Sequence, residues 1–292
     1  MQGLLGPKVS TALSTMGPVF YEIIGQTILD VYNGTKRFAI KREMSMSDSL
    51  GWRHKFAVLI PSTNTSVQPE FDAMRPPGVT NHISRIRIPN IPLNNDADFQ
   101  RLIELIAAAQ DEAVDAVMSC EPDRLVLGIS AETFWDGLAA SRALKIQLHE
   151  RTGLPVSMGS EACDAAFQAL GMKKIAVVTP YQPVGDRNVV RFFEESGFEV
   201  RRIKGLCCES PVKIAHVSEA QLRDALMELD GDDIDGLVQV GTNLAMARLA
   251  GQAETWLRKP VVAINTAIYW NALRSSAVTD RISGFGSLLE RH

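Results

Sequence analysis

From residue 55 to the end of the chain, short runs of valine, isoleucine and leucine alternate with longer segments whose apolar residues recur every three or four positions. This alternation is typical of βαβ units built around a parallel sheet, so the sequence predicts an α/β fold. We expect strands over residues 56–60, 83–88, 124–127, 156–158, 175–178, 199–203, 236–240 and 261–264. We expect helices over residues 96–117, 134–150, 161–170, 184–196, 219–229, 244–257 and 267–275.

The chain also repeats itself at a coarse level. Residues 55–62 (KFAVLIPS) resemble residues 174–181 (KIAVVTPY), and residues 123–130 (DRLVLGIS) resemble residues 235–242 (DGLVQVGT), in the same order and at similar spacing. Two similar α/β halves explain both pairs, although any two buried parallel strands share valine and leucine. We place the first half at residues 51–155 plus 262–292 and the second at residues 156–261.

Residues 1–50 do not follow this pattern. Their apolar stretch lacks both a basic start and a small-residue cleavage site, so it does not indicate a signal peptide. Met44 and Met46 lie shortly before the first expected strand. We therefore predict that this segment is an N-terminal extension that the fold does not use.

Composition excludes several classes of partner. The 292 residues include 30 basic and 34 acidic residues without a basic run, which argues against nucleic acid. No apolar stretch approaches the roughly 20 residues of a membrane span. The four cysteines and five histidines show no metal-binding spacing, so we expect reduced thiols, no metal and a cytoplasmic location.

Four expected strands end in small or hydroxyl-bearing residues. These ends are residues 61–65 (PSTNT), 128–132 (GISAE), 179–182 (TPYQ) and 241–243 (GTN). Ligands of open α/β sheets bind beyond the carboxyl ends of the strands, where amides and hydroxyls can hold an anion. Helix capping by the same residue types is the alternative. Because the four ends are pseudo-equivalent, we favour a pocket for a small carboxylate.

The segments at 61–65 and 179–181, together with Ser130 and residues 134–137 (FWDG), resemble the aspartate/glutamate racemase superfamily. The branch they resemble most is that of the maleate isomerases and arylmalonate decarboxylases, over residues 53–290. This resemblance implies two pseudo-symmetric flavodoxin-like halves, each with a mostly parallel four-stranded sheet flanked by helices. It also implies cofactor-independent isomerase, racemase or decarboxylase chemistry on a small carboxylate or amino-acid-like compound.

In that superfamily, the chemistry depends on one or two cysteines placed after the third strand of each half. A thiolate can take a proton from carbon, return one, or add to an alkene. In this chain the two positions are occupied by Ile129 and Gly241. The superfamily mechanism therefore cannot operate here unchanged.

Other positions do match the superfamily pattern. The resemblance implies that Asn64 and Tyr181 hold a substrate carboxylate, and that Ser130 and Thr242 form an oxyanion-binding pair. Ser62 and Asn243, from the same strand ends, complete the expected substrate-binding set. A further asparagine expected in the loop at 205–210 is absent, because that loop reads GLCCES.

Three residues are candidates for the missing catalytic group. Cys207 and Cys208 could enter the cleft from their loop, with buried or incidental thiols as the alternative. Glu132 could act from the head of its helix, where a solvated first-turn carboxylate is the commoner role. His216 could supply a base and Arg187 could contact an anionic substrate, with a purely structural role as the alternative for each.

The chain also resembles the type A ectoine-utilisation proteins, both in residues 240–244 (VGTNL) and in lacking the two cysteines. This resemblance suggests a catabolic role. We therefore carry two hypotheses. The first is a cofactor-independent enzyme that acts on a small carboxylate between two halves. The second is a non-catalytic protein that binds the same ligand. In either case we expect a homo-oligomer.

Overall fold

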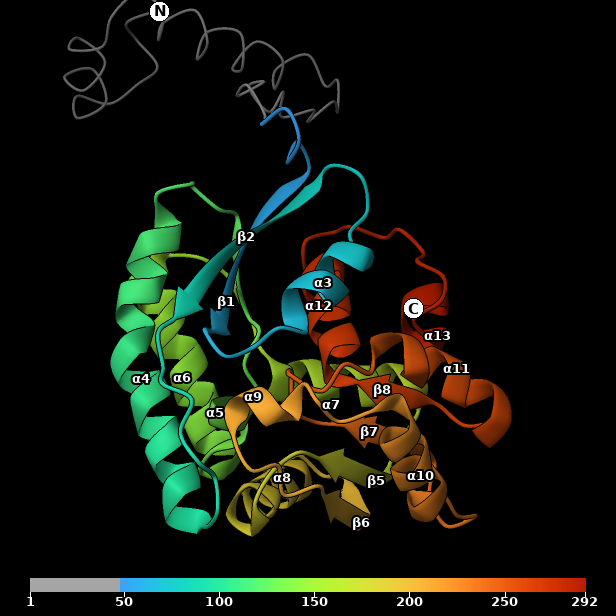
Figure 1. Cartoon of the computed structure of the whole chain (residues 1–292). Coiled ribbons are helices and arrows are strands. Elements are labelled where there is room, and N and C mark those ends of the chain that lie inside the picture. Colours follow the sequence, from blue (N-terminus) through green and yellow to red (C-terminus); the bar gives the residue numbers. More distant parts are fainter. Residues whose placement is uncertain (1–47) are drawn as a thin grey trace, which may run out of the picture. The chain divides into compact units, whose positions relative to one another are not determined.

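The computed structural model describes residues 48–292, which form two four-stranded sheets (Figure 1). The first sheet has the order β2-β1-β3-β4 and contains β1 (His54–Pro61), β2 (Val79–Ile86), β3 (Arg124–Leu127) and β4 (Val156–Ser157). The second has the order β6-β5-β7-β8 and contains β5 (Lys174–Thr179), β6 (Glu199–Gly205), β7 (Gly236–Gln239) and β8 (Val261–Ala263). All their pairings are parallel, which confirms the predicted fold class.

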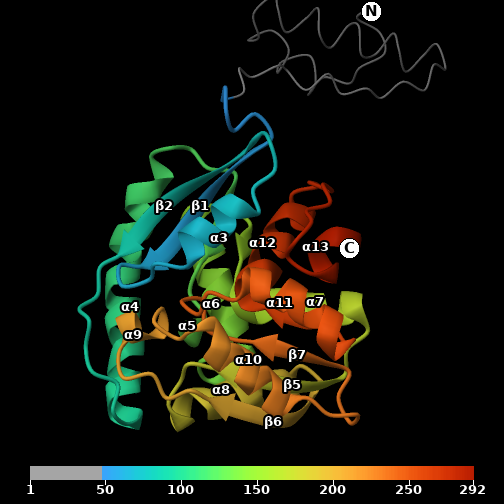
Figure 2. The same ribbon diagram turned by 45° about the vertical axis from the view of Figure 1, so that its right-hand side comes forward.

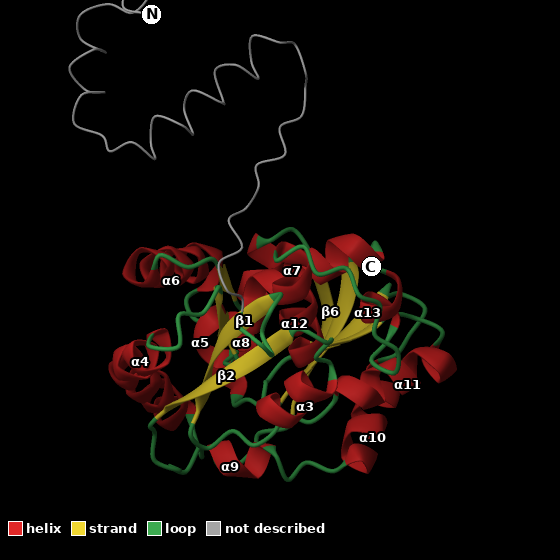
Figure 3. Ribbon diagram, turned by 90° about the horizontal axis from the view of Figure 1, so that it is seen from above, coloured by secondary structure: helices red, strands yellow, loops and turns green. Residues whose placement is uncertain are grey.

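Helices cover both sheets, as the view from above shows (Figure 3). In the first part of the chain they are α3 (Val67–Ala73), α4 (Asp96–Met118), α5 (Ala131–Phe134), α6 (Gly137–Thr152) and α7 (Gly159–Leu170). In the second part they are α8 (Pro183–Glu195), α9 (Pro211–Ile214), α10 (Glu219–Leu229), α11 (Ala247–Leu257), α12 (Ile264–Ser275) and α13 (Ser287–Arg291). Because both faces of each sheet are covered, the central strands β3, β5 and β7 are buried along almost their whole length and are mostly apolar.

The internal repeat appears as equivalent strands with equivalent contacts. The β1 and β5 strands are central in their sheets, and each is flanked on one side by the strand that follows it along the chain. The Lys55 amide donates to Asp123 Oδ2 at 2.7 Å, and the Lys174 amide donates to Asp235 Oδ2 at the same distance. The repeated sequence therefore gives repeated tertiary structure.

The two halves exchange a helix. The α7 helix follows the last strand of the first sheet, but its Phe167 packs against Phe198 beside the second sheet, at 5.1 Å between ring centroids. The α12 helix follows the last strand of the second sheet, but its Tyr269 packs against Phe56 in the first sheet, at 6.0 Å. The predicted boundary at residue 156 needs a correction, because β4 pairs with β3 and belongs to the first half.

Some predicted elements differ from the structure. The second strand was expected at residues 83–88, where isoleucines recur, but β2 begins at Val79 because it pairs along the whole of β1. The short helices α3, α9 and α13 were not predicted, since four to seven residues carry little helical periodicity. Of the extension predicted at residues 1–50, residues 1–47 lie outside the described residues.

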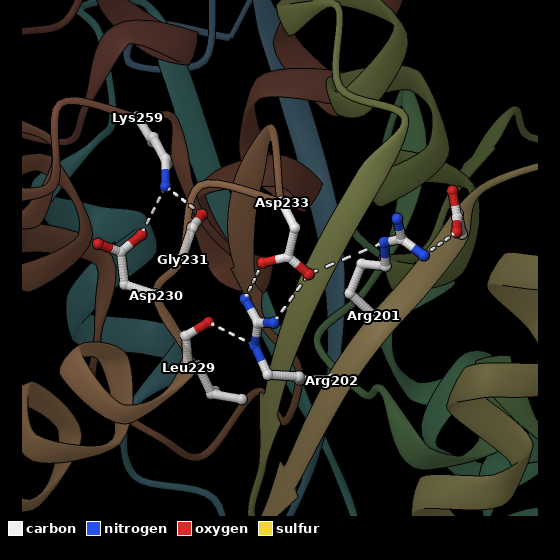
Figure 4. A network of polar contacts seen from close by, with 8 residues as sticks. Arg201, Arg202, Leu229, Asp230, Gly231, Asp233 and Lys259 are labelled. Carbon is white, nitrogen blue, oxygen red and sulfur yellow. Dashed lines mark hydrogen bonds and ion pairs between the residues drawn. The ribbon is translucent and has the colours of Figure 1, made fainter.

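Charged side chains gather at the amino ends of the second sheet (Figure 4). Arg202 donates to both carboxylate oxygens of Asp233 at 2.9 Å and to the Leu229 carbonyl at 3.0 Å. Lys259 donates to Asp230 Oδ1 at 2.8 Å. These contacts fix the loops that enter β7 and β8, and they lie at the opposite end of the strands from the residues predicted to bind substrate. Within residues 48–292, none of the helices combines the length and the apolar character of a membrane span.

Candidate active site

A cavity of about 50 Å³ lies where the carboxyl ends of strands from both sheets meet. This volume is room for about four water molecules. Its polar lining is formed by Thr63, Asn64, Ser130, Tyr181, Thr242 and Asn243. Five of the six residues predicted to bind substrate therefore share one cavity, although they come from four separate segments of the sequence.

Ser62 is the exception. Its side chain does not line the cavity. Instead, its hydroxyl donates to the Ile88 carbonyl at 3.0 Å and accepts from the Ile88 amide at 3.1 Å. This residue holds the strand β1 end against the segment that follows β2, so it has a structural role.

A chain of hydrogen bonds joins the polar residues across the two halves. Ser130 Oγ lies 2.6 Å from the Tyr181 hydroxyl oxygen and accepts from the Thr242 amide at 3.1 Å. Thr242 Oγ1 accepts from Asn64 Nδ2 at 3.2 Å and donates to the Gly128 carbonyl at 3.0 Å. Because these side chains are nearly inaccessible to solvent, their hydrogen bonds hold them in fixed positions.

Burial determines the protonation state of the tyrosine. It raises the pKa of Tyr181 well above its usual range, while the hydrogen bond with Ser130 acts in the opposite direction. Tyr181 is therefore a neutral phenol at physiological pH and can donate a proton but cannot serve as a preformed base.

Asn64 is positioned by the turn that it forms. Its Oδ1 accepts from the amides of Ser66 and Val67 at 3.0 Å each, so the side chain caps the start of α3. This leaves Nδ2 for Thr242 and for the cavity. Capping and ligand binding, which were alternatives at the sequence level, are thus compatible in one residue.

Asn243 fastens the two halves together. Its Oδ1 accepts from the Thr65 amide at 2.9 Å, and its Nδ2 donates to the carbonyls of Pro211 at 3.0 Å and Thr63 at 3.4 Å. Both of its amide hydrogens are used in these contacts. It lines the cavity, but its side chain has no free hydrogen with which to bind a ligand.

The two positions that correspond to the expected cysteines face the same cavity. Ile129 and Gly241 both belong to its lining. Gly241 has φ +111°, and a Cβ atom there would lie 2.4 Å from Pro180 Cδ. The local backbone therefore favours glycine at this position, independently of any chemistry.

The remaining lining is apolar. Phe99, Leu102 and Ile106 contribute one face of α4, and Ile214 comes from the short helix α9; Figure 2 labels both helices. Sequence reasoning missed these residues, because an apolar stripe on a helix predicts core packing as readily as a ligand contact.

Glu132 lies next to the cavity but does not line it. Burial raises the pKa of its carboxyl group from 4.5 to about 7. Its Oε2 is buried without a hydrogen-bond partner among the described residues. The solvated first-turn role considered for this carboxylate does not describe its surroundings.

The two loop cysteines do not reach the cavity. Cys207 is exposed, while Cys208 is buried and its amide donates to the Pro180 carbonyl at 3.0 Å. Burial raises the pKa of the Cys208 thiol to about 11, so it is protonated at neutral pH. His216 is exposed, and Arg187 forms an ion pair with Asp96 at 2.6 Å. None of these four residues lines the cavity.

Glu70 supports the cavity from outside. It accepts from the Ala247 amide at the start of α11 at 2.8 Å and from Asn265 Nδ2 at 2.6 Å. Asn265 in turn donates to the Thr242 carbonyl at 2.9 Å. Burial raises the pKa of the Glu70 carboxyl group. The sequence held no signal for this residue, because its partners are about 180 positions away.

The described residues contain no cluster of three or more histidine, cysteine, aspartate or glutamate side chains that could hold a metal ion. The cavity instead offers neutral hydroxyl and amide groups beside an apolar wall. Such an arrangement can bind a small anion and stabilise negative charge that develops on it.

Comparison with known proteins supports the resemblance drawn from the sequence. The sequence pattern of the arylmalonate decarboxylase family matches residues 95–289. The maleate isomerase of Pseudomonas putida (strain KT2440) is 25% identical over 253 residues, which is 81% of this chain and 97% of the relative. The arylmalonate decarboxylase of Bordetella bronchiseptica is 27% identical over 144 residues, covering 49% of this chain and 60% of the relative.

Solved structures share the same fold. A maleate cis-trans isomerase of Nocardia farcinica, a cysteine-to-serine variant with a covalently bound succinylcysteine intermediate, superposes with a TM-score of 0.75 at 22% identity. The superposition covers 82% of this chain and 99% of that chain. A crystal structure of arylmalonate decarboxylase gives a TM-score of 0.66 at 21% identity, covering 80% and 98%.

Proposed function

Since this chain belongs to the arylmalonate decarboxylase family, we propose that it binds a small carboxylate compound between its two halves and acts on it as an isomerase or decarboxylase. Its relatives are maleate isomerases and arylmalonate decarboxylases, which are enzymes.

The convergence of Asn64, Ser130, Tyr181 and Thr242 around one cavity carries this proposal. Neutral donors beside an apolar wall can hold a carboxylate and stabilise the enolate-like charge formed beside it. The small size of the cavity suits a compound of few atoms.

We further propose that no cysteine takes part in the reaction. Ile129 and Gly241 occupy the positions of the expected thiols, and Cys207 and Cys208 lie outside the cavity. The Ser130–Tyr181 hydroxyl pair is the proposed proton donor to carbon, because it is neutral and lines the cavity. The phenol or alcohol that gives up the proton would recover one from solvent after product release.

Incubation of the protein with small carboxylates in deuterated water tests the activity. The panel includes maleate, malonates, aspartate and acids derived from ectoine, and NMR follows deuterium incorporation and new products. We expect turnover of at least one compound, unchanged by prior treatment with iodoacetamide. Turnover abolished by iodoacetamide would contradict the cysteine-free proposal.

A non-catalytic carboxylate-binding protein is the second candidate. It is favoured by one observation: among the described residues that line the cavity, Tyr181 is the only titratable side chain. This candidate predicts that a ligand raises the unfolding temperature without deuterium exchange or product formation. A role in ectoine utilisation, a cytoplasmic location and a homo-oligomeric state remain proposals based on the sequence.

A further inference from the structure

The outer edge of β2 is open among the described residues. This strand is the first in the order of its sheet, so one side pairs with β1 and the other pairs with no strand of residues 48–292 (Figure 2). A groove of about 470 Å³ follows this side between α3 and α4. It is lined by Gln68 of α3, residues 81–84 of β2, Ala116 and Val117 of α4, and Cys120.

The backbone of β2 offers free hydrogen-bonding groups along this edge. The Ile86 carbonyl accepts from the Ser62 amide at 2.8 Å, so the even-numbered residues of β2 turn their backbone groups toward β1. Backbone groups alternate in direction along a strand, and those of Asn81, Ile83 and Arg85 therefore point outward. These three residues have no strand partner on that side within the described part of the chain.

The equivalent edge of the second sheet is protected, and the β2 edge is not. The β6 strand carries Arg201, Arg202 and Lys204, and its pairing with β5 contains a register shift. Charged side chains and bulges on edge strands are common devices against pairing with another chain. The β2 strand pairs with β1 in regular register along its whole length, and Arg85 is its only lysine, arginine, aspartate or glutamate. Its edge therefore suits a further strand.

The charges beside this edge indicate a second copy of the same chain. Exposed Arg85 lies near one end, and exposed Asp72 of α3 lies near the other, where it accepts from Asn81 Nδ2 at 2.9 Å. A two-fold axis at Ile83 would pair two β2 strands antiparallel and place residue 85 of one copy opposite residue 81 of the other. Each Arg85 would then meet Asp72 of the other copy.

Both charged groups have capacity for this contact. Arg85 donates to the Asn64 carbonyl at 2.6 Å and to Gln68 Oε1 at 3.1 Å, which uses two of its five guanidinium hydrogens. Asp72 accepts from Asn81 through Oδ1, and its Oδ2 accepts no hydrogen bond within residues 48–292. The same two side chains can therefore serve both copies at once.

Exposed apolar side chains adjoin the same edge. Leu50 is 73% exposed and Trp52 is 56% exposed, and both line a depression that also includes Thr80, Asn81 and His82. The antiparallel register places residues 79 and 80 opposite residues 87 and 86 of the second copy. The chain beyond β2 of that copy would thus approach these side chains, and burying them would favour association.

We propose that the β2 edge is a homodimer interface, in which two copies join their first sheets into one continuous sheet through antiparallel β2 strands. None of Asp72, Asn81, Ile83 and Arg85 lines the cavity. The interface is therefore distinct from the candidate active site, and it does not depend on the proposed function.

Sedimentation velocity of the full-length protein across micromolar concentrations tests the interface, and we expect a reversible dimer. Arg85→Glu and Asp72→Arg should each raise the dissociation constant of the dimer at least tenfold, because like charges then face each other in both symmetry-related contacts. The double variant restores opposite charges and should return to within threefold of the parent. Loss of the bond to the Asn64 carbonyl is common to Arg85→Glu and the double variant, so this rescue reports the contact between copies.

Arg201→Glu makes the same charge change on the other edge strand, β6, and should alter the dissociation constant less than twofold. Circular dichroism checks that each variant is folded. A full-length protein that is monomeric throughout would overturn the proposal and leave the edge to another occupant, such as residues 1–47 or a different protein. Equal weakening by Arg85→Glu and Arg201→Glu, or a folded double variant as weak as the single ones, would overturn it as well.

Discussion

Gly241 shows how one residue can be fixed by its backbone rather than by chemistry. Its φ of +111° lies in the range that favours glycine, and Pro180 occupies the space that a side chain would need. A cysteine at this position would have to change the loop that follows β7. The backbone conformation at this position therefore favours glycine over the expected cysteine.

Gly241→Ala should destabilise the protein by on the order of 2–4 kcal/mol, because conformational strain adds to the clash with Pro180. Gly153→Ala is the matched control: its φ is +69°, but a Cβ there would meet nothing within 4 Å. We expect the control to cost about 1 kcal/mol. Urea unfolding measures both values, and similar costs for the two variants would show that the contact with Pro180 is unimportant.

Glu132 should make stability depend on pH. Burial raises its pKa in the folded protein from 4.5 to about 7, so the folded state binds more protons than the unfolded state between these values. The free energy of unfolding therefore falls as pH rises through this window, by on the order of 3 kcal/mol. Glu132→Gln removes this loss, and we expect the variant to be more stable than the parent at pH 8.

Urea unfolding at pH 5 and pH 8 checks this prediction. The exposed Glu112 lies on α4 and provides a control, since Glu112→Gln should leave the pH dependence of the parent unchanged. An unchanged pH dependence in Glu132→Gln would mean that its carboxyl group does not titrate in this range.

At the scale of elements, α11 depends on a residue from the other half. Its N-cap residue, Met246, makes no side-chain capping bond, and Glu70 of α3 accepts from the first helical amide instead. By contrast, α10 carries its own capping box, formed by Ser218 and Gln221. One helix start is thus set locally and the other by tertiary contact.

Glu70→Ala should cost about 1–2 kcal/mol and speed hydrogen exchange at the start of α11, because the Ala247 amide loses its partner. Ser218→Ala should cost about 1 kcal/mol with faster exchange confined to α10. Exchange measured by mass spectrometry distinguishes the two effects. Unchanged exchange in α11 of Glu70→Ala would contradict the role of Glu70 as its cap.

At the scale of the whole molecule, the exchange of α7 and α12 gives the two halves a shared hydrophobic cluster, while α10 and α11 pack on the second sheet in a separate cluster. Buried residues of the first sheet, such as Phe56, and of the second, such as Val238, belong to the same cluster. The polar bonds around Thr242 and Asn243 cross the same boundary. The cavity exists only because both halves contribute to it.

A chain that begins at Met44 should keep the stability and ligand affinity of the full-length protein, since residues 48–292 contain both complete sheets and the whole cavity. Thermal unfolding of both forms, with and without each acid of the carboxylate panel, tests this expectation. A fall in unfolding temperature of more than about 5 °C, which corresponds to more than 1 kcal/mol, would show that the preceding residues stabilise the fold.

The sequence alone predicted the features that depend on local order. The apolar strands, the repeat and the four polar strand ends all appear in the structure, because short-range periodicity and strand order determine them. Five of the six residues that it placed at the substrate site line the cavity, since carboxyl ends of parallel strands lie at one edge of a sheet.

Only the tertiary structure decided which of these side chains keep a free hydrogen. The side-chain amide of Asn243 uses both of its hydrogens and that of Asn64 does not, although both are asparagines at strand ends. Cys207 points to solvent and Glu132 is buried, and neither could be deduced from its neighbours. Both asparagines have hydrogen-bond partners 178 positions away in the chain. Packing of the two halves brings those partners together. Local sequence patterns cannot predict these contacts, because they reflect only neighbouring residues.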